Sequence, residues 1–404
     1  MKKRLLYILL ALPATLLLAG ISSCNNVEHN HEDLTIDEGA TELVAPPDPP
    51  SLAPPDSAQT PEPEEAPTPE QTPEPEETPT STPAPTPTPS FGFIDAHADS
   101  ISRALELPEN SRSLFDNDAL HVDFRRLLEF GTPLQFFALW TSTALVADVY
   151  NHTNRMLDFF EEQVENHSGI IEIARDFEDI LRIANSGKIT AILSIEGGEA
   201  LMGDIENLTH FYNRGVRSLG LLWNRENELG FGWPQGRTQG LTPFGIDVIQ
   251  KMDELGIIMD VSHLNEAGFW DAHNASTRPY MASHSNAYAV TPHNRNLNDD
   301  QILAIAGRGG VIGFNMFPRF VSSNNTATME DIMAHFHHFY GLGVINNIVL
   351  GADFDGITST PQGITCVLSL KHLRERLANE FCEDIAHGIM EGNFFEFLKR
   401  YFGG

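Results

Sequence analysis

Positive charge and cysteine are both scarce in this sequence of 404 residues. It holds 25 Lys and Arg residues against 56 Asp and Glu residues, which gives a formal net charge of −31. Proteins that bind nucleic acids carry basic surfaces, so this balance argues against a nucleic acid as partner. Only three cysteines are present, too few for a disulfide framework. We expect Cys366 and Cys382 to stay free thiols.

The apolar run at residues 5–20 is too short for an ordinary membrane span. It follows a basic start at residues 2–4 and ends in Ile21-Ser22-Ser23-Cys24. This is the layout of a secretory signal peptide, and its ending resembles a bacterial lipobox. We therefore predict a signal peptide over residues 1–23 and a lipid on Cys24, which anchors a chain without spanning the membrane. An ordinary signal peptide with a chance cysteine is the alternative.

Residues 25–90 lack Lys and Arg altogether. They hold 17 prolines and 15 acidic residues, with Thr and Ser filling much of the remainder. Such a segment cannot bury enough apolar surface to fold, so we predict a disordered, extended tether that begins at the lipidated Cys24. We expect it to hold a folded domain, residues 91–404, at the extracellular face of a bacterial cell membrane. That domain is long enough for one large core.

Short, apolar, β-rich runs recur along the domain. They lie at residues 91–99, 132–142, 189–200, 216–224, 256–264, 279–286, 309–318 and 347–356. Few charges interrupt them, as expected for strands that are buried on both faces. Between them lie amphipathic stretches with helical spacing, for example 149–164, 244–255 and 329–340. The alternation predicts an α/β fold, a (β/α)8 TIM-type barrel. A doubly wound open sheet is the alternative, but no Gly-rich phosphate loop follows the first run.

Residue types that bind metals stand at the ends of five of these runs. They are His97 with Asp99, then Glu196, His263 and His284, and finally Asp353 with Asp355. In a barrel the active site lies at the C-terminal ends of the strands. Each of these residues alone could belong to a turn or an ordinary hydrogen bond. Together they predict a metal centre at the barrel mouth, because zinc binds imidazole nitrogen and carboxylate oxygen.

Longer motifs of the domain resemble those of a known family. They are IEGGEALMGDIENLTHFYNRGVR (195–217), GLTPFG (240–245), DVSH (260–263), SHSNAYAVTPHNRN (283–296) and GADFDG (351–356). They are similar to motifs of the membrane (renal) dipeptidase family of zinc metallopeptidases, in the amidohydrolase superfamily. The resemblance covers nearly all of the domain. It implies a (β/α)8 barrel, two zinc ions per chain and hydrolysis of dipeptides through a hydroxide that bridges the metals.

The resemblance also assigns the metal ligands. It implies that His97, Asp99 and Glu196 hold one zinc ion. Glu196 would bridge to a second ion, whose coordination His263 and His284 complete. Two metals close together lower the pKa of a water between them and polarise the scissile carbonyl, so the bridging carboxylate counts among the catalytic residues.

Two further matches concern proton transfer and substrate binding. Asp353 matches the family's catalytic aspartate, which can take a proton from the attacking water and pass it to the leaving amine. Arg295 matches the arginine that binds the substrate's carboxylate, for which a planar guanidinium is suited. Glu199 and Trp223 depart from the animal members, which have histidine at both positions. Since the second of those histidines contacts the substrate carbonyl, we place Trp223 among the substrate-binding residues.

The expected function is therefore the hydrolysis of dipeptides outside the cell. The expected partners are a dipeptide, the membrane that receives the lipid, and a second copy of the chain in a homodimer. Two alternatives stay open: a related amidohydrolase that acts on N-acyl amino acids or lactams, and a catalytically silent, lipid-tethered binding protein. The presence of every expected ligand argues against the second. We expect His335, His337 and His338 to serve helix packing.

Overall fold

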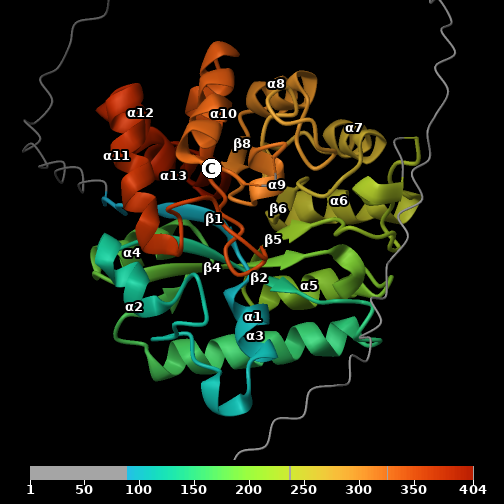
Figure 1. The fold of residues 1–404 in the computed structure, drawn as a ribbon. Coiled ribbons are helices and arrows are strands. Elements are labelled where there is room, and N and C mark those ends of the chain that lie inside the picture. The colour runs from blue at the N-terminus through green and yellow to red at the C-terminus, as the bar shows by residue number, and fades with distance from the viewer. Residues whose placement is uncertain (1–88, 236–237, 325, 404) are drawn as a thin grey trace, which may run out of the picture. The chain divides into compact units, whose positions relative to one another are not determined.

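The computed structural model describes residues 89–235, 238–324 and 326–403 (Figure 1). The predicted signal peptide, Cys24 and almost all of the predicted tether lie outside this described part. The strands are β1 Ile94–Ala98, β2 Leu134–Trp140, β3 Ile171–Ile173, β4 Ile189–Glu196, β5 Val216–Gly220, β6 Ile258–Asp260, β7 Met281–Ala282, β8 Val311–Phe314 and β9 Ile348–Leu350. The helices are α1 Ser100–Glu106, α2 Phe124–Leu127, α3 Val149–Asn166, α4 Phe177–Asn185, α5 Glu206–Asn213, α6 Pro243–Leu255, α7 Glu266–Ala275, α8 Asp299–Gly307, α9 Pro318–Val321, α10 Met329–Gly341, α11 Leu370–Glu380, α12 Glu383–His387 and α13 Asn393–Phe402.

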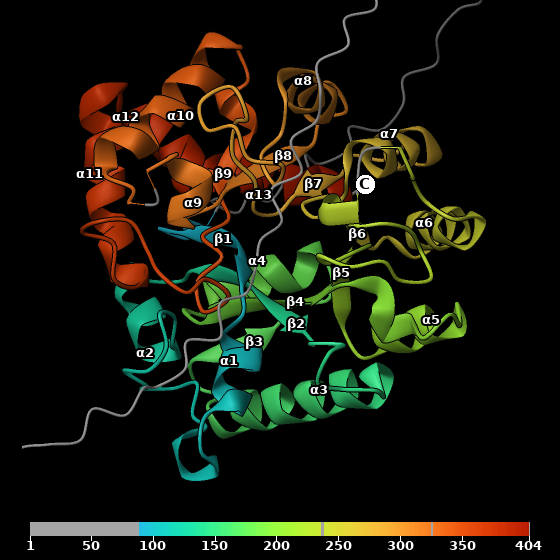
Figure 2. The same ribbon diagram turned by 45° about the vertical axis from the view of Figure 1, so that its right-hand side comes forward.

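All strands but β3 form a closed parallel barrel. The neighbours run in the order β1, β2, β4, β5, β6, β7, β8 and β9, and a pairing of Asp95 with Leu350 joins β9 back to β1. In Figure 2 the strand labels follow this ring. Most helices lie outside it, whereas α4 and α13 are seen within it in this view. The predicted (β/α)8 barrel is confirmed, and each predicted strand has a counterpart.

Strand β3 is the one strand that the apolar pattern did not reveal. It pairs with the first residues of β4, as Ile171 with Ile189, before β5 takes over that edge at Leu193. The strand is only three residues long and carries Glu172 at its centre. A segment this short, with a charged residue at its centre, has no detectable period.

The side chains of β4 that point into the barrel run from its apolar interior to the mouth. Ile192 belongs to an apolar cluster that joins residues of seven barrel strands with α13. Tyr401 of α13 donates a hydrogen bond to the carbonyl of Ile257, just before β6, so α13 lies at the N-terminal end of the barrel. Alternate residues of a strand share a face. Glu196, four residues beyond Ile192, therefore points the same way at the opposite end.

The predicted helices form with the expected caps and contacts. Thr242 caps α6 by accepting a hydrogen bond from the backbone of Gly245, with Pro243 in the first turn, which is the preferred position for proline. The three histidines of α10 contact protein groups: His335 Nε2 lies 3.0 Å from the carbonyl of Val321, and His337 and His338 pair with acidic side chains. His335 is buried within the helix packing, whereas His337 is exposed and His338 is partly exposed, and both form ion pairs at the surface.

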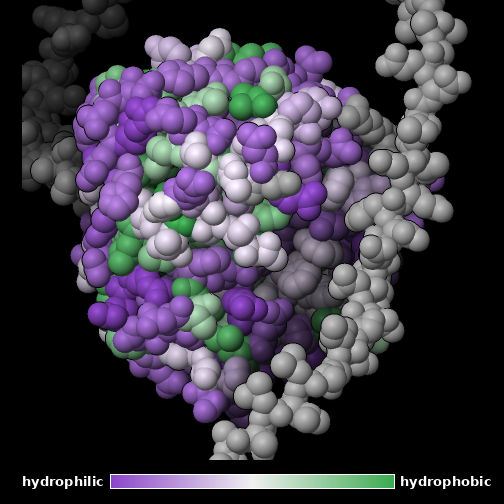
Figure 3. All heavy atoms as spheres, in the orientation of Figure 1, coloured by the Kyte–Doolittle hydropathy of each residue, from purple (hydrophilic) through white to green (hydrophobic). Residues whose placement is uncertain are grey.

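The outer surface of the domain is mostly polar. Figure 3 shows one face, on which hydrophilic side chains predominate and hydrophobic ones lie scattered among them. Among the described residues, no helix is both long and apolar enough to cross a membrane. Cys366 is partly buried and Cys382 is exposed, and both are free thiols.

Candidate metal centre

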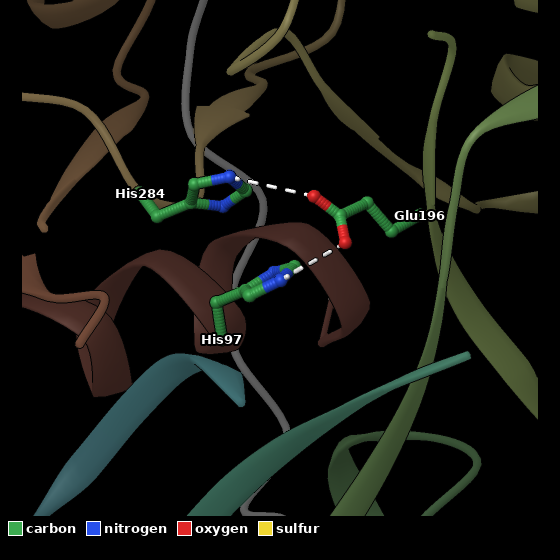
Figure 4. Close-up of side chains that lie close together, drawn as sticks. All are labelled: His97, Glu196 and His284. Carbon is green, nitrogen blue, oxygen red and sulfur yellow. Dashed lines mark ion pairs between the residues drawn. The ribbon is translucent and has the colours of Figure 1, made fainter. Parts of the chain in front are cut away.

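Glu196, at the end of β4, lies at the centre of the predicted site. Its Oε2 is 3.6 Å from His97 Nε2, at the end of β1. Its other oxygen, Oε1, is 2.8 Å from His263 Nε2 and 3.5 Å from His284 Nε2, which follow β6 and β7. Figure 4 shows this carboxylate beside the rings of His97 and His284, with one oxygen directed toward each ring. One oxygen thus faces each of two groups, as a bridging carboxylate requires.

The first group, which we call the acidic side, consists of His97, Asp99 and Asp353. One potential ligand atom from each lies within 4.8 Å of the other two, and His97 Nε2 is 3.3 Å from Asp99 Oδ2. His97 and Asp99 come from β1 and the residue after it, while Asp353 comes from the loop after β9. The structure thus brings Asp353 close enough to act on whatever the other two residues bind.

The second group, which we call the imidazole side, consists of His263, His284 and Arg295. The Nε2 atoms of the two histidines lie only 2.9 Å apart, and both are close to Glu196 Oε1. Three atoms that can each offer a lone pair therefore converge on a small volume. Such convergence is typical of ligands that share a cation.

The burial of these atoms fits a metal ion. His97, Asp99, Glu196, His263 and His284 each expose 8% or less of their surface. Within the described residues, however, His97 Nε2 and Asp99 Oδ1 are buried without a hydrogen-bond partner. A buried polar atom without a partner is costly, and a cation here would satisfy both atoms. Imidazole nitrogen and carboxylate oxygen are also ligands that zinc accepts.

Burial also controls the charges in the site. It raises the pKa of Glu196 to about 8, an effect to which the charge of Asp99 adds. It raises the pKa of Asp353 to about 7. Burial opposes the charged form of His97 too, but Glu196 and Asp99 outweigh it and hold the pKa of His97 well above its usual value. Carboxylates this close repel one another, and a bound cation would relieve that repulsion.

Ser283 and Asp260 orient the ring of His284. Asp260 ends β6, and it accepts hydrogen bonds from the backbone N–H of Ser283, at 2.9 Å, and from the Ser283 hydroxyl. With its proton directed to Asp260, Ser283 Oγ can only accept from His284 Nδ1, which is 2.7 Å away. The proton of His284 therefore sits on Nδ1, and the lone pair of Nε2 faces Glu196. Outer partners of this kind fix the tautomer of metal-binding histidines.

The loop after β9 carries two aspartates that have similar backbone conformations but different hydrogen-bond partners. Asp353 and Asp355 both lie in the left-handed region, with φ of 59° and 70°. Asp353 Oδ2 accepts a hydrogen bond from Asn315 Nδ2 at 2.9 Å. Asp355 instead accepts from the Ser100 hydroxyl at 2.5 Å and the His121 backbone at 2.6 Å. Asp353 therefore belongs to the metal centre, while Asp355 holds two surrounding segments together.

Gly356 allows the carboxylates of the acidic side to approach each other. A Cβ atom at this position would lie 2.2 Å from Asp99 Oδ2 and 2.6 Å from Asp353 Oδ1. Real side chains do not make contacts this short, so any other residue would push the two carboxylates away. The last glycine of the GADFDG motif thus has a direct role in the geometry of the site.

Arg295 is almost completely buried on the imidazole side, with 4% of its surface exposed. Its Nη1 donates a hydrogen bond to the carbonyl of Ser262, and its Nη2 lies 3.0 Å from His263 Nε2. Burial lowers the pKa of Arg295 to about 10, so the guanidinium remains charged at neutral pH. Arg295 also lines the cavity in front of the metal centre, where a carboxylate could reach it.

That cavity has a volume of about 670 Å³, which suits a small molecule. Both sides of the site contribute to its lining, as do three of the four tryptophans of the chain, Trp140, Trp223 and Trp233. The rings of Trp140 and Trp223 lie 4.9 Å apart. Trp223 therefore lines the cavity, and its role in substrate binding stays a prediction.

Four polar residues of the site were missed in the sequence: Asn224, Asp260, Ser283 and Asn315. The serine directly before His284 was a signal for a hydroxyl partner of that ring. The serine before His263 instead contacts Asp260 and the backbone of His284. Nothing comparable marked the two asparagines. Their contacts join residues 38 and 39 positions apart, and only the closed barrel brings them together.

Comparison with known proteins identifies the family. A family model for membrane dipeptidases, peptidase family M19, matches residues 88–401. The chain belongs to this family. Dipeptidase tcpJ of Claviceps purpurea is 29% identical over 257 residues, which are 60% of each chain. The chain is thus a hydrolase of a metallo-dipeptidase family.

Solved structures of the M19 family share the fold. The dipeptidase AC, a metallopeptidase of family M19, is 28% identical, with a TM-score of 0.73 over 78% of this chain and 100% of its own. A metallopeptidase of Rhodobacter sphaeroides, bound to a phosphinate mimic of the dipeptide L-Ala-D-Ala, is 27% identical. Its TM-score is 0.71 over 77% of this chain and 99% of its own.

Proposed function

We propose that this M19 domain is a binuclear zinc dipeptidase. The main support for two ions is Glu196, since one of its oxygens faces the acidic side and the other faces the imidazole side. His97 and Asp99 would share one ion with Glu196, and His263 and His284 would share the other. When bound, the ions would activate a water molecule and polarise the scissile carbonyl.

Asp353 then performs the proton transfer. Asn315 holds its Oδ2 at 2.9 Å, so Oδ1 can accept a proton from the attacking water and return it to the leaving amine. Burial raises the pKa of Asp353 to about 7. Bound cations nearby would lower this pKa, so Asp353 would be ionised and ready to accept the proton of the attacking water, as a general base requires.

Arg295 and the tryptophans position the substrate. The guanidinium can bind the terminal carboxylate of a dipeptide through two parallel N–H groups, which aligns the scissile bond with the metal centre. Trp140 and Trp223 form an apolar wall of the cavity and exclude water from the bound peptide. The ligand of the Rhodobacter sphaeroides relative is the reason to include L,D-dipeptides among the substrates.

The proposal is tested by metal analysis and a substrate panel on the soluble protein. We expect about two zinc ions per chain, together with hydrolysis of L,L- or L,D-dipeptides. One ion or none under zinc-replete conditions would contradict the binuclear centre. Hydrolysis of N-acetylated amino acids in preference to free dipeptides would favour the amidohydrolase alternative, and two bound ions without turnover would favour a binding protein.

We also propose that a lipid on Cys24 tethers the domain outside the cell, and that the domain forms a homodimer. The support for the tether is the signal-like sequence before Cys24 and the proline-rich segment after it. Cys24→Ala should shift the protein from the membrane fraction to the soluble fraction. Unchanged membrane retention of this variant would rule out the lipid anchor. Sedimentation of the soluble protein tests the homodimer.

A further inference from the structure

Asn224 connects a tryptophan to a proposed metal ligand. It lies in the loop after β5, and its Oδ1 accepts a hydrogen bond from Trp233 Nε1 at 2.6 Å. The same oxygen lies 3.0 Å from His263 Nδ1. Because the nitrogen of an indole can only donate, the atom that faces Trp233 must be the amide oxygen rather than the amide nitrogen. The side-chain orientation of Asn224 is thereby determined.

The orientation of Asn224 determines which nitrogen of His263 carries the proton. An amide oxygen only accepts hydrogen bonds, so His263 Nδ1 must be the donor. A neutral imidazole carries a single proton. That proton is on Nδ1, and Nε2 is left with a lone pair.

The other side of the ring leads independently to the same tautomer. Arg295 Nη2 lies 3.0 Å from His263 Nε2, and a guanidinium nitrogen can only donate. Facing this donor, His263 Nε2 accepts. Glu196 Oε1 and His284 Nε2, 2.8 and 2.9 Å away, then face it lone pair to lone pair, an arrangement that a shared cation would satisfy. The indole of Trp233 and the guanidinium of Arg295 can only donate hydrogen bonds. Both contacts place the proton of His263 on Nδ1.

The loop that carries Trp233 is fixed to the backbone next to His263. The backbone N–H of Trp233 donates to the carbonyl of His263 at 3.1 Å, and Gly232 pairs with Leu264 in a short antiparallel bridge. A Cβ atom on Gly232 would lie 2.5 Å from the carbonyl of Trp223. This close packing determines where the indole of Trp233 can donate its proton.

We propose that Asn224 is a positioning residue that holds His263 in the tautomer able to bind a metal, and that Trp233 locks the orientation of Asn224. For His284 this role belongs to Ser283 and Asp260. The inference rests on the proposed role of His263 as a zinc ligand. It predicts that the loop with Trp233 controls the affinity of the imidazole side for zinc without touching the metal.

Zinc affinity of the full-length protein, measured by chelator competition, tests the proposal. Asn224→Leu keeps the approximate size but removes the acceptor, and it should weaken the more weakly bound zinc by about 10–100-fold, the usual effect of losing an outer partner. Asn224→Asp keeps the acceptor and should bind zinc at least as tightly as the wild type. Trp233→Phe should cost about three- to tenfold, whereas the matched control Trp270→Phe should cost nothing.

A second measurement does not depend on catalysis. Long-range 1H–15N spectra of histidine-labelled, chelator-treated protein report the tautomer, and the signals of His263 are identified by their loss in His263→Gln. We expect the Nδ1–H form in the wild type and a mixture in Asn224→Leu. If dipeptides are not hydrolysed, the proposed function fails, but the tautomer and the zinc affinity still decide this inference.

Two results would overturn it. One is the Nε2–H form of His263 in the wild type, which can be measured even if Asn224→Leu does not fold. The other is unchanged zinc affinity in both Asn224→Leu and Trp233→Phe.

Discussion

The acidic side and the imidazole side of the metal centre flank the same carboxylate but differ in chemistry. On the acidic side, buried carboxylates crowd around His97, and atoms such as His97 Nε2 and Asp99 Oδ1 have no hydrogen-bond partner within the described residues. On the imidazole side, the Nδ1 atoms of His263 and His284 contact oxygen atoms of neighbouring side chains. One side attracts a cation by charge, whereas the other binds it through oriented, neutral rings.

This difference suggests that the two sides have different roles in the proposed reaction. The acidic side contains Asp353, the proposed proton-transfer group, whose pKa burial raises to about 7. The imidazole side contains the fixed cation Arg295, which is suited to hold the substrate's carboxylate. Proton transfer and substrate alignment thus lie on opposite sides of Glu196, and variants on the two sides should fail in different ways.

Glu196→Gln should have the largest effect, because it removes the carboxylate that joins the two sides. We expect kcat/KM to fall by about 10⁴-fold, in the range seen when a member of a catalytic unit is lost, and zinc to be lost from both positions. The matched control is Glu199→Gln. Glu199 is also buried, but its carboxylate accepts a hydrogen bond from Asn227, so zinc content should be unchanged. Loss of only one zinc in Glu196→Gln would mean that this residue does not bridge.

Asp353→Asn affects the acidic side alone. The amide keeps the shape but cannot take up the proton, so kcat should fall by roughly 10²–10⁴-fold with zinc content nearly intact. Asp355→Asn is the control, since Asp355 only ties Ser100 to the segment at His121. It should lower the melting temperature more than kcat. If Asp353→Asn loses zinc instead, Asp353 is a ligand as well as a base.

Arg295→Lys affects the imidazole side alone. A lysine cannot reproduce two parallel hydrogen bonds to a carboxylate, so kcat/KM should fall by about tenfold or more. Amidation of the dipeptide's C-terminus should impair the wild type much more than the variant. Arg308→Lys is the control, because Arg308 bonds the backbone of Ser276 and His273. Equal penalties for amidation in the wild type and in Arg295→Lys would show that Arg295 does not bind the carboxylate.

Without zinc, the shifted pKa values of the two sides should make the stability of the protein depend on pH. The folded pKa values of Glu196 and Asp353, about 8 and about 7, lie above their ordinary values of 4.5 and 3.8. Between the ordinary and the raised pKa of each group, the folded protein therefore binds more protons than the unfolded protein. Over this pH range the free energy of unfolding falls as pH rises. The raised pKa of His97 acts in the same direction. The lowered pKa values of His263 and His284 act in the opposite direction, but only below about pH 6.5.

Between pH 6.5 and 8.5, chelator-treated protein should thus lose roughly 1 kcal/mol or more of unfolding free energy. Zinc-loaded protein should not, because zinc binds the deprotonated ligands more tightly as pH rises. Thermal unfolding at several pH values measures both. Stability of the chelator-treated protein that stays level or rises over this range would contradict the predicted charges.

The sequence alone was sufficient for the barrel and for the residues at its mouth. Uninterrupted apolar runs indicate strands that are buried on both faces, and their alternation with amphipathic helices predicts a parallel barrel. The C-terminal ends of parallel strands meet at one face. His97, Glu196, His263 and His284 could therefore be placed together without knowledge of any distance, because chain direction alone brings them to the same end.

The tertiary structure decided how these residues are oriented and which neighbours assist them. Asp353 and Asp355 have the same side chain two positions apart, and only their hydrogen bonds to Asn315 and to Ser100 separate their roles. The contact between Asn224 and His263 spans 39 residues. Local sequence patterns report which face of a strand or helix a residue occupies. They do not report which polar groups meet once the barrel has closed, because that depends on strand stagger and on the path of each loop.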